Sequence, residues 1–223
     1  MREIVLDTET TGLDPDIGHR IVEIACLELV NHLPTGRTFQ RHLNPERDIP
    51  PDALAIHGLS QEFLSGQKVF AEVAGELLEF IADTPLIIHN AEFDLKFLNA
   101  ELARLGLAPI MAHRAIDTML IARRKFPGAP ASLDALCNRF NIDNSKRTLH
   151  GALLDAELLS EVYLELIGGR QATMELAAGE GSSASATATG RTTRPPRPHA
   201  PTPAEAAAHA ALLARLKSPI WSR

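Results

Sequence analysis

The sequence predicts a mixed α/β fold, in which a sheet is flanked by helices and followed by a flexible C-terminal tail. Strand-like apolar runs come first along the chain, and helical periodicities that alternate with short strand-like runs follow them. After Gly169 the composition changes to Gly, Ser, Ala and Thr and then to Arg and Pro. Such a segment buries too little apolar surface to offset its ordering entropy. We therefore expect a folded domain over residues 1–169 and a flexible linker over residues 177–201.

The composition limits the classes of function. At 223 residues, of which 45% are hydrophobic, the chain can form one sizeable core and an appendage. The net charge of −6 excludes a global basic surface that grips duplex DNA through many phosphates. Cys26 and Cys137 form no C-x-x-C pair, so both are expected to be reduced core residues. Without an apolar run of membrane length or a signal-peptide pattern, a cytoplasmic protein with no membrane partner is expected.

The first apolar run, residues 4–6, is expected to be a buried strand that leads into a turn at residues 12–15. Asp7 and Glu9 stand two residues apart, so on a strand their side chains point to the same side. Two carboxylates about 5 Å apart repel by roughly 3 kcal/mol at an effective dielectric of 20. Either these acids mark a strand end open to water, or a cation lies between them.

The remaining elements follow from periodicity and end signals. Further strands are expected at residues 19–30 and 36–43, joined by a turn at 33–36 as an antiparallel meander. The apolar spacing from Phe70 to Ile81 predicts an amphipathic helix packed on the core. A short strand is expected at residues 86–90. Apolar stripes predict further helices at residues 92–105, 115–126, 133–140 (capped by Ser132) and 151–167.

Two more acids fall in positions that suggest chemistry. Asp94 lies in the first turn of a helix that directly follows a strand, where an acid can also serve the helix dipole alone. Asp155 shares the core-facing stripe of its helix with Leu158, Leu159 and Val162. A buried carboxylate needs a cation or a dense shell of hydrogen bonds. Four acids that offer only oxygen ligands suit magnesium or manganese better than zinc.

Two such cations about 4 Å apart can stabilise both the attacking and the leaving oxygen in phosphoryl transfer. In that arrangement Asp7 bridges the two ions, Glu9 and Asp155 complete one site, and Asp94 holds the other. His150 stands just before the helix of Asp155, with Gly151 beside it. A histidine side chain suits a general base at neutral pH. A structural or solvated histidine is the alternative.

These residues resemble the three exonuclease motifs of the DEDDh 3′–5′ exonuclease superfamily. The motifs are Asp7-x-Glu9, Asp94 at the end of residues 89–94, and His150 followed five residues later by Asp155. Within the superfamily, residues 3–176 are most similar to the epsilon subunits, the proofreading exonucleases of bacterial DNA polymerase III. The resemblance implies a ribonuclease H-like fold, two divalent metal ions (Mg²⁺ or Mn²⁺), and removal of mismatched nucleotides from single-stranded or frayed DNA 3′ ends.

The resemblance also implies which residues contact the substrate. Besides the metal-site acids Asp7, Glu9 and Asp155, they are Thr10, Asp52 and His57. Asp52 and His57 match a loop that approaches the terminal nucleotide, although His57 can equally be a turn residue.

Three segments follow the exonuclease domain. Residues 170–176 resemble a peptide that binds a sliding clamp, with Gln171, Met174 and Leu176 in the clamp pockets. After the linker, a helix is expected to begin at Thr202, with Glu205 completing a capping box.

Residues 202–223 resemble the segment that anchors epsilon subunits to the polymerase III alpha subunit, through Leu212, Leu216 and Trp221. The resemblance leaves room for a small theta-like subunit as a further partner. Tethering allows weak contacts to suffice, because linked sites meet at an effective concentration of about millimolar.

Two other functions remain compatible with parts of this pattern. A free-standing RNA-trimming exonuclease of the same superfamily would use the same acids, but the tail would then have no purpose. A non-catalytic structural subunit of the polymerase complex would have no reason to cluster uncompensated acids.

Overall fold

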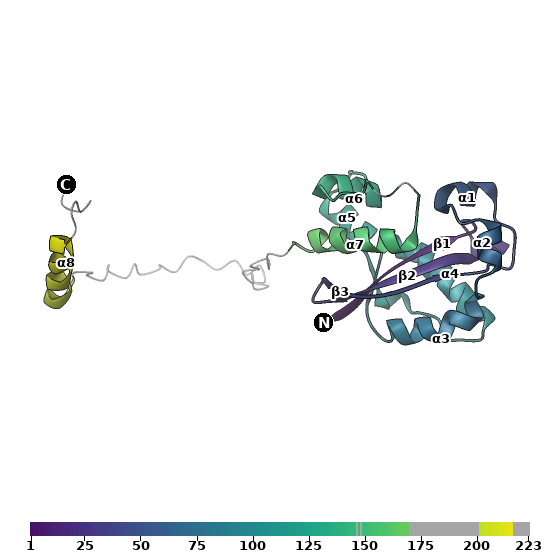
Figure 1. Ribbon diagram of the computed structural model, residues 1–223, viewed down its shortest axis with the longest axis horizontal. Helices are drawn as coiled ribbons and strands as arrows, with labels where there is room; N and C mark the ends of the chain where they lie inside the picture. Colours follow the sequence, from purple (N-terminus) through teal and green to yellow (C-terminus); the bar gives the residue numbers. More distant parts are fainter. Residues whose placement is uncertain (146, 148, 170–200, 216–223) are drawn as a thin grey trace, which may run out of the picture. The chain divides into compact units, whose positions relative to one another are not determined.

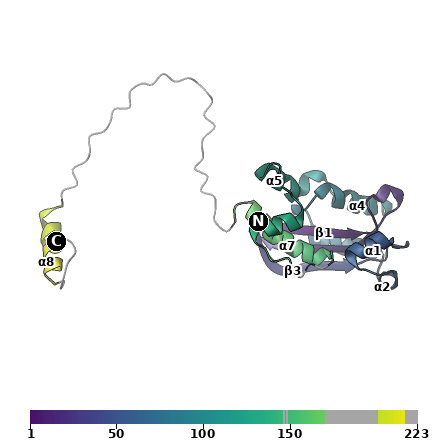
Figure 2. The same ribbon diagram turned by 90° about the horizontal axis from the view of Figure 1, so that it is seen from above.

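The structure is a computed structural model that describes residues 1–145, 147, 149–169 and 201–215. The chain divides into two units, Met1–Met174 and Glu175–Arg223. The first unit contains a five-stranded sheet with helices on both faces (Figures 1 and 2). The described part of the second unit is the helix α8 (Pro203–Arg215).

The sheet has the order β3-β2-β1-β4-β5. The central strand β1 pairs antiparallel with β2 and parallel with β4, so the carboxyl ends of β1 and β4 meet at one edge. The outer pairs are antiparallel for β2 with β3 and parallel for β4 with β5. The strands are β1 (Arg2–Thr10), β2 (Ile21–Val30), β3 (Leu33–His42), β4 (Leu86–Ile88) and β5 (Ala115–Asp117).

Two layers of helices cover the two faces of the sheet (Figure 1). Ile4 and Leu6 of β1 pack with α3 (Phe70–Ile81) and α4 (Ala91–Arg104). Val5 points to the opposite face, since strand side chains alternate. There it packs in a second core with three helices. These are α5 (Thr118–Lys125), α6 (Leu133–Phe140) and α7 (Ala152–Leu166).

Short elements connect the layers. The helices α1 (Pro51–His57) and α2 (Gln61–Ser65) lie between β3 and α3, and the 3₁₀ turns are η1 (Pro15–Ile17) and η2 (Ala112–Arg114). Cys26 and Cys137 are buried free thiols, as predicted. Among the described residues, no helix has both the length and the apolarity that a membrane span requires.

The predicted mixed fold is confirmed, and several predicted helix ends are reproduced. Helix α3 spans Phe70 to Ile81, as its apolar spacing predicts. The Ser132 hydroxyl accepts a hydrogen bond from the N–H of Ala135 at the start of α6. At the start of α8, Thr202 and Glu205 form the predicted capping box.

The predicted turn at residues 33–36 is wrong. The chain reverses at Asn31 and His32, whose φ angles of 52° and 65° are both positive. A two-residue hairpin loop of type I′ requires this conformation at both positions. Pro34 then lies inside β3, opposite Leu29. The position is tolerated because β3 is an edge strand, where a missing N–H donor need not break the sheet.

The predicted single helix over residues 115–126 is also wrong, because its first three residues form β5. Asp117 ends this strand and caps α5, with Oδ1 accepting from the N–H groups of Met119 and Leu120. Its Oδ2 accepts from the N–H of Ala91, at the start of α4. Asp117 therefore fixes the beginning of the helix that carries Asp94.

Candidate active site

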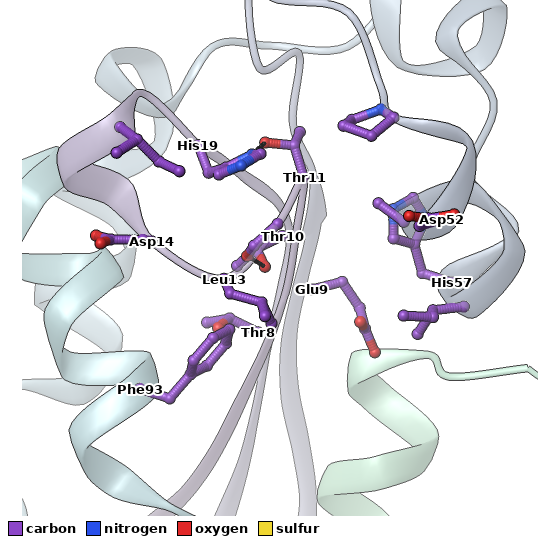
Figure 3. A pocket seen from close by; sticks show the side chains of 15 residues that line it. Thr8, Glu9, Thr10, Thr11, Leu13, Asp14, His19, Asp52, His57 and Phe93 are labelled. Carbon is purple, nitrogen blue, oxygen red and sulfur yellow. Dashed lines mark hydrogen bonds between the residues drawn. The ribbon is translucent and has the colours of Figure 1, made fainter.

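Two adjoining pockets lie at the carboxyl end of β1 and share Thr8, Glu9 and Phe93. We name the first, of about 300 Å³, the acidic pocket. It is lined by Asp7, Glu9, Asp94, Asp134, Arg147, His150 and Asp155 among others. The second, of about 580 Å³, is here called the outer pocket and lies between η1, α1 and the end of β1 (Figure 3).

Asp7 and Glu9 of β1 lie in the acidic pocket with poorly compensated charge. Burial is the main reason why the pKa of Asp7 lies well above its usual range, and the charges of Asp94, Glu9 and Asp155 raise it further. Burial, followed by the charge of Asp155, raises the pKa of Glu9 to about 8. Ionising these groups together at neutral pH costs free energy unless a cation joins them.

Asp94 reaches the acidic pocket from α4, on the other face of the sheet. It is 3% exposed, and its Oδ1 accepts a hydrogen bond of 2.7 Å from the Thr8 hydroxyl. Burial raises the pKa of Asp94 to about 7, although the hydrogen bond from Thr8 opposes the rise. Asp94 thus adds a third strongly perturbed carboxyl group to the pocket.

Asp155 lies in the first turn of α7 and is 4% exposed, as its stripe predicts. A buried carboxylate needs a cationic partner or hydrogen bonds, and Arg147 provides both. Nε and Nη2 of Arg147 donate to the two oxygens of Asp155 at 2.5 and 2.6 Å. Hydrogen bonding to Asp155 is the main cause that raises the pKa of Arg147. Nη1 of Arg147 donates to both oxygens of Asp134, each at 2.9 Å.

His150 lies at the mouth of the acidic pocket, with about half of its side chain exposed. Its Nδ1 is 2.8 Å from Nη2 of Arg147 and 3.5 Å from Oδ2 of Asp155. Its backbone N–H donates to the carbonyl of Ile56, which ties the loop to α1. One donor atom each from Glu9, His150 and Asp155 lie within 4.8 Å of one another, close enough to hold one metal ion. Asp7 and Asp94 line the same pocket but do not belong to this group of three residues.

The outer pocket contains the three other expected substrate contacts (Figure 3). The Thr10 hydroxyl donates to the carbonyl of Gly12 at 2.6 Å. Asp52 is exposed in the first turn of α1, on the same helix as the buried His57. Figure 3 shows both across the pocket from Leu13, with Glu9 between them.

His57 lines this pocket, and one nitrogen of its ring has no hydrogen-bond partner among the described residues. Nδ1 accepts from the N–H of Leu59 at 3.0 Å, which places the proton of a neutral ring on Nε2. Burial lowers the pKa of His57, so the neutral form is favoured. Nε2 is buried and meets no hydrogen-bond partner within the part of the chain that the structure describes. The role of His57 as a substrate contact therefore stays a prediction.

Sequence reasoning assigned no role to several groups that shape the site. Arg147 binds Asp155, Thr8 binds Asp94, and Leu13 and Phe93 line the outer pocket. Glu23 interrupts the apolar run of β2, a signal that is visible in the sequence. It is paired with Glu9 in the sheet, and its Oε2 accepts from the N–H of Ala152 at the start of α7.

The expected partner contacts fall mostly outside the described residues. Gln171, Met174, Leu176, Leu216 and Trp221 lie there. Leu212 is described on α8, where its side chain is 54% exposed.

The donors in the acidic pocket fit divalent cations. They are mainly carboxylate oxygens, the ligands that magnesium and manganese prefer. Burial and then repulsion among the acids raise the pKa values of Asp7 and Glu9, and bound positive charge would favour their ionised forms. The ligand set carries no thiolate, because Cys26 and Cys137 lie in the two cores and not in this pocket.

Comparisons with known proteins identify the family of the chain. Residues 4–163 match the exonuclease family. The chain is 58% identical to the DNA polymerase III subunit epsilon of Rickettsia felis over 179 residues, which cover 79% of this chain and 78% of that protein. It is 47% identical to the Escherichia coli K12 subunit epsilon over 176 residues, covering 76% of this chain and 72% of that protein.

Solved structures agree on the fold. Exonuclease X in complex with 5′ overhanging duplex DNA has a TM-score of 0.59 at 26% identity, and the match covers 74% of this chain and 90% of that one. The nuclease domain of 3′hExo, a DEDDh family member bound to rAMP, has a TM-score of 0.64 at 20% identity, covering 74% and 91%. The chain therefore belongs to the exonuclease family and, within it, to the DNA polymerase III epsilon subunits, as a 3′–5′ exonuclease.

Proposed function

We propose that this exonuclease removes mismatched nucleotides from DNA 3′ ends by metal-assisted hydrolysis, as the proofreading subunit of a DNA polymerase III. The observation that carries the proposal is the convergence of buried carboxylates from β1, α4 and α7 beside a pocket large enough for a nucleotide. The names of the relatives support the polymerase and its DNA as the context.

The acids have distinct tasks in this proposal. Asp7, Glu9, Asp94 and Asp155 would hold two divalent cations, Mg²⁺ or Mn²⁺. Such cations supply positive charge to the attacking and leaving oxygens of the phosphodiester. The protein fixes the acids through Thr8, which holds Asp94, and through Asp117, which holds the start of α4.

The outer pocket is proposed to take the terminal nucleotide. Glu9 lines both pockets, and the nucleotide is proposed to place its phosphate next to the acidic pocket. Nε2 of His57 donates a hydrogen bond to the sugar or phosphate, and Leu13 and Phe93 offer apolar surface to the base. Thr10 and Asp52 supply further polar contacts at the wall.

The test is degradation of a DNA primer labelled at its 5′ end, with a paired or a mismatched 3′ terminus, with and without Mg²⁺. A labelled RNA strand of equal sequence is run in parallel. Mg²⁺-dependent shortening of the mismatched DNA end, faster than of the paired end or the RNA, is expected. Preferred degradation of RNA would indicate a trimming enzyme, and inactivity with both Mg²⁺ and Mn²⁺ would contradict a catalytic role.

His150 is proposed to accept the proton of the attacking water. His150→Ala should then reduce turnover by roughly 10²–10⁴-fold. The affinity for Mg²⁺ or Mn²⁺, measured by calorimetry, should stay near that of the wild type. The exposed His113 of η2 is the matched control, and His113→Ala should change neither quantity. A large loss of metal affinity in His150→Ala would show instead that His150 is a ligand, the role that its distance to Glu9 and Asp155 also permits.

The tail is proposed to hold the partners. Gln171, Met174 and Leu176 bind a sliding clamp, and residues 202–223 bind the polymerase alpha subunit through Leu212, Leu216 and Trp221. A theta-like subunit is a further candidate partner.

Deleting residues 202–223 should remove binding to the alpha subunit in gel filtration while leaving the degradation of short single strands unchanged. Replacing Gln171, Met174 and Leu176 by Ala serves as the control, because it should weaken clamp binding alone. Association that survives the deletion would place the anchor elsewhere.

A further inference from the structure

Arg147 lines the acidic pocket, and its guanidinium donates hydrogen bonds to both oxygens of Asp155. The contacts are 2.5 Å from Nε to Oδ1 and 2.6 Å from Nη2 to Oδ2, and the Arg147 side chain is 8% exposed. A forked arginine–carboxylate pair of this kind is directional and strong. Arg147 occupies a lone pair on each oxygen, and its positive charge opposes the approach of a divalent cation to Asp155.

The guanidinium also contacts His150. Nη2 of Arg147 is 2.8 Å from Nδ1 of His150. A guanidinium has only donors, so Nδ1 must be the acceptor, and the proton of a neutral ring is then on Nε2. In this arrangement neither ring nitrogen can take a proton from water unless the contact with Arg147 breaks.

Arg147 has a second anchor. Nη1 donates to both oxygens of Asp134, in the first turn of α6. The Asp134 side chain is 53% exposed, whereas that of Asp155 is 5% exposed. A guanidinium that leaves Asp155 therefore keeps a carboxylate partner at the rim of the pocket, where water can reach its freed donors.

We propose that Arg147 is a positioning residue that competes with divalent cations for Asp155, so that cation binding moves its guanidinium to Asp134 and frees Nδ1 of His150. The inference rests on the proposed function for the role of the acidic pocket as the cation site. The consequence is that cation binding at Asp155 is coupled to the release of His150. The proton acceptor becomes available at the moment when the cation takes Asp155.

The first test is the affinity of the full-length chain for Mn²⁺, measured by calorimetry on the wild type and on Arg147→Gln and Arg147→Lys. Competition predicts that Arg147→Gln binds Mn²⁺ more tightly, on the order of tenfold, because Asp155 no longer has a charge-assisted bond to lose. Arg147→Lys keeps the charge but lacks the fork, so it should also bind more tightly than the wild type. The control is Arg124→Gln, an exposed arginine of α5, which should leave the affinity unchanged.

Two outcomes would overturn the proposal. An affinity of Arg147→Lys equal to that of the wild type would mean that Arg147 acts through its charge alone. Unchanged affinity in both variants, with a lower unfolding temperature, would make Arg147 a scaffold residue. The comparison measures metal binding and not hydrolysis. If the wild type binds Mn²⁺ but degrades no primer, the proposed function is wrong, and the metal affinities still test the role of Arg147.

A second measurement needs no variant to fold. In the wild type labelled with ¹⁵N-histidine, adding Mg²⁺ should shift the Nδ1 resonance of His150 as its bond from Arg147 is lost, while that of the exposed His113 stays in place. A His150 signal that does not respond, at Mg²⁺ concentrations that saturate the site, would contradict displacement of Arg147.

Discussion

Asp7→Ala is expected to reduce hydrolysis of a DNA 3′ end by on the order of 10³-fold or more, since it removes a carboxylate from the proposed cation site. The same change should raise stability when metal is removed with EDTA. Burial and the charges of Asp94, Glu9 and Asp155 all raise the pKa of Asp7, so its ionised form opposes folding. For a chain of this size, each kcal/mol of relieved repulsion should raise the unfolding temperature by about 2–4 °C.

Thermal unfolding in EDTA and in Mg²⁺ measures the expected gain in stability that accompanies the loss of activity. Asp7→Asn is the companion variant, because it removes the charge and leaves no cavity. Asp83→Ala, at an exposed position after α3, is the matched control and should change neither activity nor stability. An Asp7→Ala protein that unfolds far below the wild type in EDTA would show that Asp7 holds the fold together, contrary to the repulsion argument.

The acids of this site could be predicted from the sequence because each depends on local periodicity. Strand alternation places Asp7 and Glu9 on one side, and helical spacing turns Asp155 towards the core, where it is 4% exposed. Asp94 follows from its place directly after a strand. None of these inferences requires knowing how distant segments meet.

The residues that position or bind those acids depend on tertiary contacts, so local sequence patterns could not predict them. Arg147 precedes α7, and its guanidinium contacts both Asp155 of α7 and Asp134 of α6. Glu23 meets the N–H of Ala152 across 129 residues of sequence. The strand Ala115–Asp117 is too short to show a period of two, and its pairing with β4 decides its conformation.

The pH dependence of stability is expected to run opposite to that of a protein held by salt-bridged acids. Burial raises the pKa of Glu9 from an ordinary 4.5 to about 8, and that of Asp94 from 3.8 to about 7. At a pH between the ordinary and the raised pKa, each of these two carboxyl groups is protonated in the folded chain but ionised in the unfolded chain. The free energy of unfolding in EDTA should therefore fall as the pH rises from about 4 to about 8. With roughly 1.4 kcal/mol for each pKa unit, the loss amounts to several kcal/mol.

Urea unfolding at pH 5, 6, 7 and 8 measures this slope. Glu9→Gln should flatten it and should be more stable than the wild type at pH 8 in EDTA, while Glu62→Gln, at an exposed position of α2, should follow the wild type. Saturating Mg²⁺ should remove most of the slope, because a cation stabilises the ionised carboxylates that otherwise repel one another. A wild-type stability in EDTA that rises from pH 5 to pH 8 would mean that Arg147 already compensates the acidic pocket. The cations would then be needed for chemistry and not to relieve repulsion in the fold.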